Sequence, residues 1–147
     1  MKKLVVLLVI ISMFLGACGD GLDYSQGKDS MAAFGNGNYQ ILHGYRNDEE
    51  INTLYNCKHK QEVVTNVDNY EEKENYIFFV GKFREQKVFC KLNLETNLLY
   101  YYAEGNGEEY FDIEFDSVIE DKQIELLSSF DDFSEEDRLE FERLTNN

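Results

Sequence analysis

Alternation of apolar and polar residues in the second half of the chain constrains the fold more than any other feature. Over 87–94 one set of alternate residues is entirely apolar, and 110–116 alternates between large apolar and acidic side chains. A period of two indicates a strand with one buried face. Two more strand-like runs, 76–80 and 98–103, lie only a few residues away from these. Because short loops join antiparallel neighbours, we predict a β-meander.

The residues before this meander have weaker patterns. After a turn signal at 34–37, residues 38–45 and 62–67 have the composition of strands. Residues 48–55 begin with acidic side chains and continue with apolar side chains at helical spacing, so a short helix is predicted there. The charged stretch 68–75 is predicted to be a loop.

The period of the pattern changes after the meander. Ser117 and Glu120 fit a capping box, and the apolar residues that follow favour a helix over 118–129. A second helix is predicted after Ser134, with acidic residues in its first turn and Arg143 near its end. The predicted fold class is α+β, an antiparallel β-meander of about 4–6 strands followed by two C-terminal helices.

The first 18 residues have the organisation of a secretory signal peptide. Lys2 and Lys3 precede an apolar run over 4–15, and the small residues Gly16 and Ala17 lead to Cys18. The apolar run is shorter than the roughly 20 residues that a membrane-spanning helix needs. A cleaved signal peptide is therefore favoured over an uncleaved transmembrane segment.

The end of this segment, Leu15-Gly16-Ala17-Cys18, resembles the lipobox of bacterial lipoproteins. The resemblance implies that residues 1–17 are removed and that Cys18 carries a diacylglycerol. It also implies a lipid-anchored protein at the extracytoplasmic face of the cell membrane, where two acyl chains suffice for stable anchoring. An ordinary signal peptide is the alternative. Residues 18–33 then form a flexible tether, and 34–147 form a single small extracytoplasmic domain.

The mature chain is strongly acidic. Loss of Lys2 and Lys3 leaves 12 Lys and Arg against 29 Asp and Glu, a net charge of −17. Nucleic acid and anionic phospholipid are repelled by such a chain, so nucleic-acid binding is excluded and the lipid alone must hold the protein to the membrane. Two interpretations of the charge stay open: it keeps the domain in solution, or it attracts a cationic peptide or envelope protein.

The sequence offers one candidate binding surface. If 110–116 is a strand, its acidic residues share one face, and Tyr100-Tyr101-Tyr102 places at least one ring on the outer face of the neighbouring strand. Tyrosine beside carboxylates suits a cationic partner. The alternative is a solvated outer face, and carboxylates in a straight row do not wrap a metal ion. The candidate residues are Glu108, Glu109, Asp112, Glu114, Asp116, Tyr100, Tyr101 and Tyr102.

Two cysteines remain in the predicted domain. Cys57 and Cys90 could form a disulfide in an oxidising compartment, whereas Cys90 in a strand would equally serve as a small buried hydrophobe. Cys57 and His59 stand close in sequence, but two ligands are too few for a zinc site. We therefore expect no metal and no other cofactor.

These observations favour a membrane-anchored, non-catalytic lipoprotein that binds through an acidic, tyrosine-bearing sheet face. An immunity-type or accessory lipoprotein that captures a basic peptide or toxin is the alternative. An envelope enzyme is less favoured, because the chain has no nucleophile elbow, phosphate-binding loop or metalloprotease motif.

Overall fold

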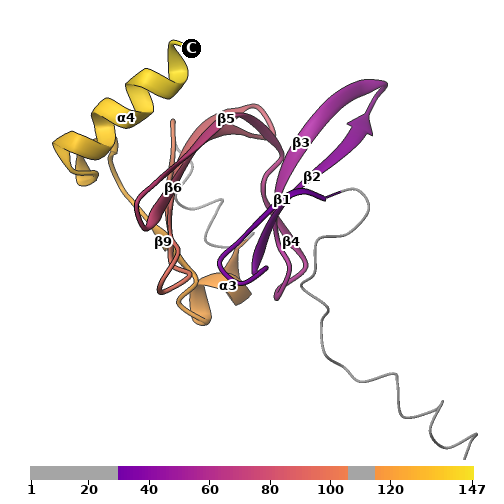
Figure 1. The fold of residues 1–147 in the computed structure, drawn as a ribbon, viewed down its shortest axis with the longest axis horizontal. Coiled ribbons are helices and arrows are strands. Elements are labelled where there is room, and N and C mark those ends of the chain that lie inside the picture. The colour runs from indigo at the N-terminus through magenta and orange to yellow at the C-terminus, as the bar shows by residue number, and fades with distance from the viewer. Residues whose placement is uncertain (1–29, 106–114) are drawn as a thin grey trace, which may run out of the picture.

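The computed structural model describes residues 30–105 and 115–147, apart from the side chains of residues 116 and 117. Within these residues nine strands form two sheets. Helical segments follow in the C-terminal part of the chain (Figure 1). The predicted α+β class is confirmed, with more strands than the meander alone supplies. No helix among the described residues is long and apolar enough to cross a membrane.

The first sheet, sheet A, is antiparallel and contains the N-terminal strands in chain order. They are β1 (Ser30–Phe34), β2 (Tyr39–Arg46), β3 (Glu49–Asn56) and β4 (Gln61–Val64). The first of them starts inside the segment 18–33 that the sequence assigned to the tether, so the folded part begins earlier than expected.

The helix predicted over 48–55 is wrong, because β3 occupies all of these residues except Asp48, which lies in the preceding turn. Asn47 and Asp48 both adopt positive φ angles, which is the requirement of the two-residue turns that join hairpin strands. All eight residues of β3 then pair with β2. Pairing along the whole hairpin therefore outweighs the helical spacing of the apolar residues in this segment.

The second sheet, sheet B, contains the runs 76–80, 87–94 and 98–103 of the predicted meander, whereas the last predicted run, 110–116, lies mostly outside the described residues. Its strands are β5 (Asn66–Lys73), β6 (Tyr76–Phe83), β7 (Gln86–Asn93), β8 (Leu99–Ala103) and β9 (Ile124–Leu126). The first four are antiparallel, and β9 pairs in parallel with β8. The loop predicted over 68–75 is wrong, because β5 pairs with β6 throughout most of this stretch.

The helical segments are α3 (Asp116–Glu120), the 3₁₀ turn η1 (Phe130–Asp132) and α4 (Glu135–Thr145). The prediction of one helix over 118–129 is wrong, because α3 ends early and Ile124 pairs with Leu99 as part of β9. The prediction for α4 is confirmed. Ser134 is its N-cap, and the Ser134 hydroxyl accepts a hydrogen bond from the backbone N–H of Asp137 at 3.2 Å.

Sheet B is the middle layer of the molecule, with sheet A on one side and α4 on the other (Figure 1). Alternate residues of its strands supply two cores. Phe79, Cys90 and Tyr101 belong to the inter-sheet core, which lies between sheets A and B. The helix-side core lies under α4 and consists of Phe78, Val80, Phe89, Phe133, Phe141 and Leu144.

The two sheets meet at a tight corner around Gly81. The backbone N–H of Thr65, between β4 and β5, donates to the carbonyl of Lys82 at 2.8 Å. A Cβ atom on Gly81 would lie 2.3 Å from the backbone oxygen of Asn66 and 2.9 Å from Cγ1 of Val64. Only glycine lets the backbone of β6 approach this corner so closely.

Candidate functional site

Most of the acidic residues predicted to bind a partner lie outside the described residues. This holds for Glu108, Glu109, Asp112 and Glu114, and for the side chain of Asp116, which begins α3. Cys18, the predicted lipidation site, also lies outside them. The acidic row and the anchor therefore stay predictions.

The tyrosine triplet is described and divides between the two faces of sheet B. Tyr101 is only 1% exposed and belongs to the inter-sheet core, so it is not available to a partner. Tyr100 and Tyr102 are half-buried on the helix side. Tyr102 packs against Phe89 and Phe130, with ring centroids 6.3 Å and 5.9 Å away. Of the three, Tyr100 lines a surface cavity.

The two cysteines of the domain do not pair in the structure. Cys90 is buried in β7, Cys57 is half-buried in the turn after β3, and both thiols are free. Burial raises the pKa of each thiol, which disfavours the reactive thiolate. His59, which is close to Cys57 in sequence, contacts Asp121, with Nε2 3.1 Å from Oδ2. This contact helps to tie the β3–β4 turn to the segment after α3.

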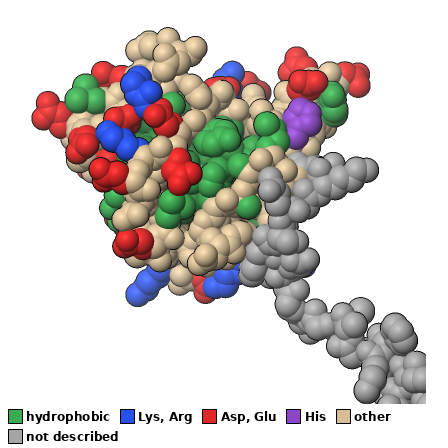
Figure 2. Space-filling view, viewed as in Figure 1, with side chains coloured by type: hydrophobic (Ala, Val, Ile, Leu, Met, Phe, Trp, Pro, Cys, Tyr) green, Lys and Arg blue, Asp and Glu red, His purple; other side chains and the backbone are tan. Residues whose placement is uncertain are grey.

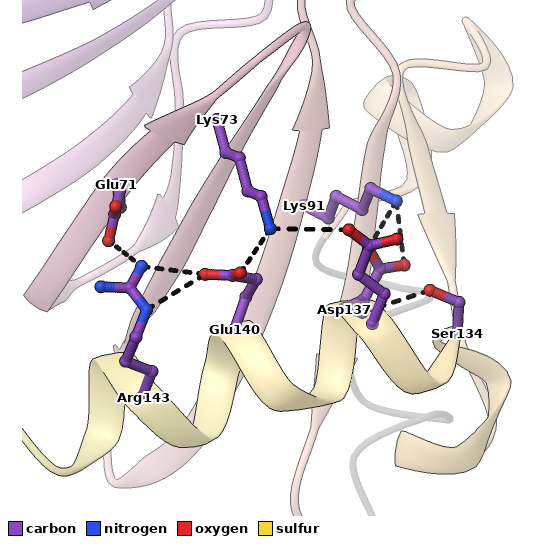
Figure 3. A network of polar contacts seen from close by, with 8 residues as sticks. Glu71, Lys73, Lys91, Ser134, Asp137, Glu140 and Arg143 are labelled. Atoms are coloured by element: carbon purple, nitrogen blue, oxygen red, sulfur yellow. Dashed lines mark hydrogen bonds and ion pairs between the residues drawn. The ribbon is translucent and has the colours of Figure 1, made fainter.

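The most organised polar site lies between sheet B and α4. Lys91 stands in the centre of the sheet, in register with Phe78 on β6 and Tyr100 on β8. Its ammonium nitrogen lies 2.7 Å and 2.9 Å from the two carboxylate oxygens of Asp137 (Figure 3). The same nitrogen lies 4.1 Å from the centre of the Tyr76 ring. The Lys91 ammonium is therefore held by two contacts, one with the face of the Tyr76 ring and one with the Asp137 carboxylate.

A second set of ion pairs ties α4 to β5 beside this site. Glu140 accepts a hydrogen bond from Lys73 at 2.5 Å and another from Arg143 at 2.8 Å, and Arg143 also contacts Glu71 (Figure 3). The hydrogen bond from Lys73, followed by that from Arg143, lowers the pKa of Glu140. The hydrogen bond to Glu140 in turn raises the pKa of Lys73.

Two cavities open on either side of the Lys91–Asp137 pair, and we call them together the α4 groove. The first cavity has a volume of about 130 Å³ and the second about 140 Å³, and the ion pair lines both. The first is lined by Lys73, Glu74, Tyr76, Phe78, Lys91, Ser134, Glu136, Asp137 and Glu140. The second is lined by Lys91, Tyr100, Glu125, Leu127, Asp132, Phe133 and Asp137.

The α4 groove is acidic and partly aromatic. Its lining contains two lysines against six carboxylates, with Tyr76 in the wall of the first cavity and Tyr100 in the wall of the second. The acidic side chains on this side of the molecule are visible around the few cations in Figure 2. Such a lining attracts cations. The Tyr100 ring offers them a second kind of contact, whereas the Tyr76 ring already contacts Lys91.

Sequence reasoning identified Tyr100 but missed the rest of the groove. Lys91 belongs to the other set of alternate residues in 87–94, and its side chain faces α4 together with that of Phe89. One sequence signal could have indicated the site: the charged residue Lys91 shares a strand face with the apolar residue Phe89. The described residues contain no group of three His, Cys, Asp or Glu side chains arranged to hold a metal ion.

Comparison with known proteins adds no relative. No protein-family model, no curated protein and no solved structure matches the chain.

Proposed function

We propose that the chain is a lipid-anchored, extracytoplasmic binding protein that captures a cationic partner in the α4 groove. The observation that carries the proposal is the lining of that groove, in which carboxylates outnumber lysines and a tyrosine stands in each cavity. The partner is a basic peptide or a basic segment of an envelope protein. The proposed role is non-catalytic.

The charge of the chain supports a cationic partner. The whole sequence has a formal net charge of −15, so its long-range field favours the approach of basic molecules. Within the groove the field is reinforced locally by carboxylates such as Glu74 and Glu125, which make no ion pair with the rest of the described chain.

The anchor part of the proposal is supported by the lipobox-like Leu15-Gly16-Ala17-Cys18. Expression with a radiolabelled fatty acid tests it directly. We expect label on the wild-type chain, and no label and no lipoprotein-type cleavage in Cys18→Ser. A processed, labelled Cys18→Ser protein in the membrane fraction would refute the anchor.

The groove is tested with an unstructured lysine-rich peptide as the probe. We expect binding at low salt that weakens sharply at high salt, because exposed charges are screened beyond about 8–10 Å at physiological ionic strength. Glu125→Gln should weaken binding, whereas Glu49→Gln removes the same charge from the distant β2–β3 hairpin and should not. Equal affinity of both variants, or no binding by the wild type, would contradict the proposal.

A further inference from the structure

We infer that an extended segment of a partner protein, with alternating apolar and basic residues, adds to β9 as a sixth strand of sheet B. The inference rests on the proposed function for the basic character of the partner, and it specifies where that partner binds and in which conformation. Three features of the described residues carry it: a free backbone edge, an apolar cavity beside that edge, and a carboxylate without an ion pair on the other face of the strand.

The backbone of β9 is paired on one side only. β9 is the last strand of sheet B, so no described strand follows it. The N–H of Leu127 donates to β8 at 2.8 Å, and the carbonyl of Gln123 accepts from β8 at 2.9 Å. In a parallel ladder this pattern directs the N–H and C=O groups of Ile124 and Leu126 away from β8. These groups form no hydrogen bond with the rest of the described chain, so they are a template for another strand.

An apolar cavity of about 480 Å³ opens beside this edge. It is lined by Leu98, Ile119, Lys122, Ile124, Glu125 and Leu126. Ile124 and Leu126 lie on the inter-sheet face of β9, because they are in register with core residues of β8. Successive side chains of an added strand alternate between the two faces of the sheet. One set of the partner's alternate residues therefore lies beside this cavity, and the lining favours apolar side chains there.

Glu125 determines the other set of alternate residues. Its side chain is exposed and lines the second cavity of the α4 groove together with Tyr100. It forms no ion pair with another described residue. Residues directly opposite each other in a ladder share a face, so the partner residue opposite Glu125 meets this carboxylate. A lysine or arginine at that position is complementary in charge.

The same carboxylate argues against a second copy of the chain as the occupant. Antiparallel pairing of two β9 strands, in the register that uses Ile124 and Leu126 of both copies, would place Glu125 opposite Glu125. Like charges directly opposite each other are destabilising, and the formal net charge of −15 on each chain adds to the repulsion. The edge is therefore complementary to a basic strand of another protein.

Fluorescence anisotropy with short labelled peptides and the full-length chain in non-ionic detergent tests the inference. The first probe alternates valine and lysine. The second has the same composition, with all valines in one block and all lysines in another. We expect the alternating peptide to bind at least about tenfold more tightly than the block peptide, because only alternation places every valine on the side of the cavity. A peptide that alternates valine and glutamate should not bind.

Methylation of the peptide backbone distinguishes strand addition from other modes of binding. In an antiparallel arrangement the valines lie opposite Ile124 and Leu126 and direct their N–H groups toward β9, whereas the N–H groups of the lysines point away. N-methylation of the valines should abolish binding, and N-methylation of the lysines should weaken it by less than about threefold. The reverse pattern would support strand addition in the parallel direction. Equal effects of the two modifications would overturn the inference.

Variants of β9 test the same edge from the side of the protein. Leu126→Pro removes an outward N–H and leaves the ladder with β8 intact, and proline is tolerated at such edge positions. It should weaken binding of the alternating peptide at least about tenfold, against about threefold for Leu126→Ala, which loses only the side chain. Glu125→Gln should weaken it about threefold, whereas Glu49→Gln in the distant β2–β3 hairpin should leave it unchanged. Unfolding curves check that Leu126→Pro is folded, and the methylated peptides test the edge independently of this variant.

The possible results distinguish this inference from the proposed function. Equal binding of the alternating and block peptides would overturn the added strand and leave a groove that binds cations. Binding of the alternating peptide, with no binding of the block peptide or of a lysine-rich peptide, would support the added strand and contradict capture by the α4 groove alone. Absence of binding by every peptide would overturn both.

Discussion

Lys91 in the centre of sheet B and Asp137 in the first turn of α4 form a two-pronged ion pair between residues that are 46 positions apart. Their side chains are 16% and 12% exposed, so both charges are largely removed from water. In such a pair the desolvation of the two charges offsets much of their attraction, and the loss of one partner is more costly than the loss of both.

Asp137→Asn should therefore lower the free energy of unfolding by about 2–4 kcal/mol, because Lys91 keeps its charge without a carboxylate. The double variant Lys91→Met with Asp137→Leu should recover most of that loss. Urea unfolding of Lys91→Met, Asp137→Leu and the double variant measures the coupling. Arg46→Ala, which breaks a pair whose side chains are 46% and 41% exposed, is the control and should cost about 1 kcal/mol or less. An Asp137→Asn variant as stable as the wild type would show that the pair is not desolvated.

Glu140 gives a prediction about pH. Its pKa is lowered in the folded state, so its ionisation stabilises the fold above the unfolded-state value, and that contribution is lost as the pH falls through the lower folded value. Glu140→Gln should reduce stability by about 1 kcal/mol near neutral pH, and the difference from wild type should shrink as the pH falls below the ordinary pKa of a glutamate. Unfolding curves recorded from neutral to acidic pH measure this difference in stability. Glu142→Gln on the same helix is the control. A stability difference between Glu140→Gln and wild type that stays constant with pH would contradict the lowered pKa of Glu140.

Two glycine substitutions test the close packing at the corner between the sheets. Gly81→Ala would force a methyl group to within 2.3 Å of the Asn66 backbone oxygen, so we expect a loss of about 2–4 kcal/mol in unfolding free energy. Gly44→Ala is the matched control, because a Cβ atom there meets nothing within 4 Å. In thermal and urea unfolding, Gly81→Ala should be clearly less stable than Gly44→Ala. Comparable stability of both would mean that the corner relaxes without cost.

The free thiols are tested by serine substitution. Cys90 is completely buried, so Cys90→Ser should cost about 1–3 kcal/mol by placing a hydroxyl in an apolar core. Cys57→Ser, at a half-buried turn, should change stability by about 0.5 kcal/mol or less. Large, equal and non-additive losses from the two variants would instead reveal a disulfide.

The elements that sequence analysis identified correctly are those fixed by local signals. The strand-like runs over 87–94 and 98–103 became β7 and β8, because alternation and short turns act between neighbours in the chain. Ser134 was identified as a helix cap for the same reason, since a cap needs only the residues that follow it.

The errors arose where distant partners decide the structure. The charged residues of β5 suggested a loop, yet Glu71 and Lys73 meet Arg143 and Glu140, which lie 72 and 67 positions further along the chain. Ile124 fitted a helical pattern equally well, and its pairing with Leu99 made it a strand. The α4 groove was missed for the same reason, because its central ion pair joins two elements whose packing no local pattern reveals.

The Lys91–Asp137 pair also has a consequence for how α4 finds its position. Phe141 follows Asp137 by four residues and belongs to the buried face of the same helix. A slide of α4 by one turn, about 5.4 Å, would put the Phe141 ring over Lys91 in one direction and the Asp137 carboxylate among phenylalanines in the other. Hydrophobic contact alone would penalise such a slide weakly, because aromatic rings adapt to one another. The buried charge of Lys91 therefore favours one register of α4 on the sheet and disfavours the two adjacent ones.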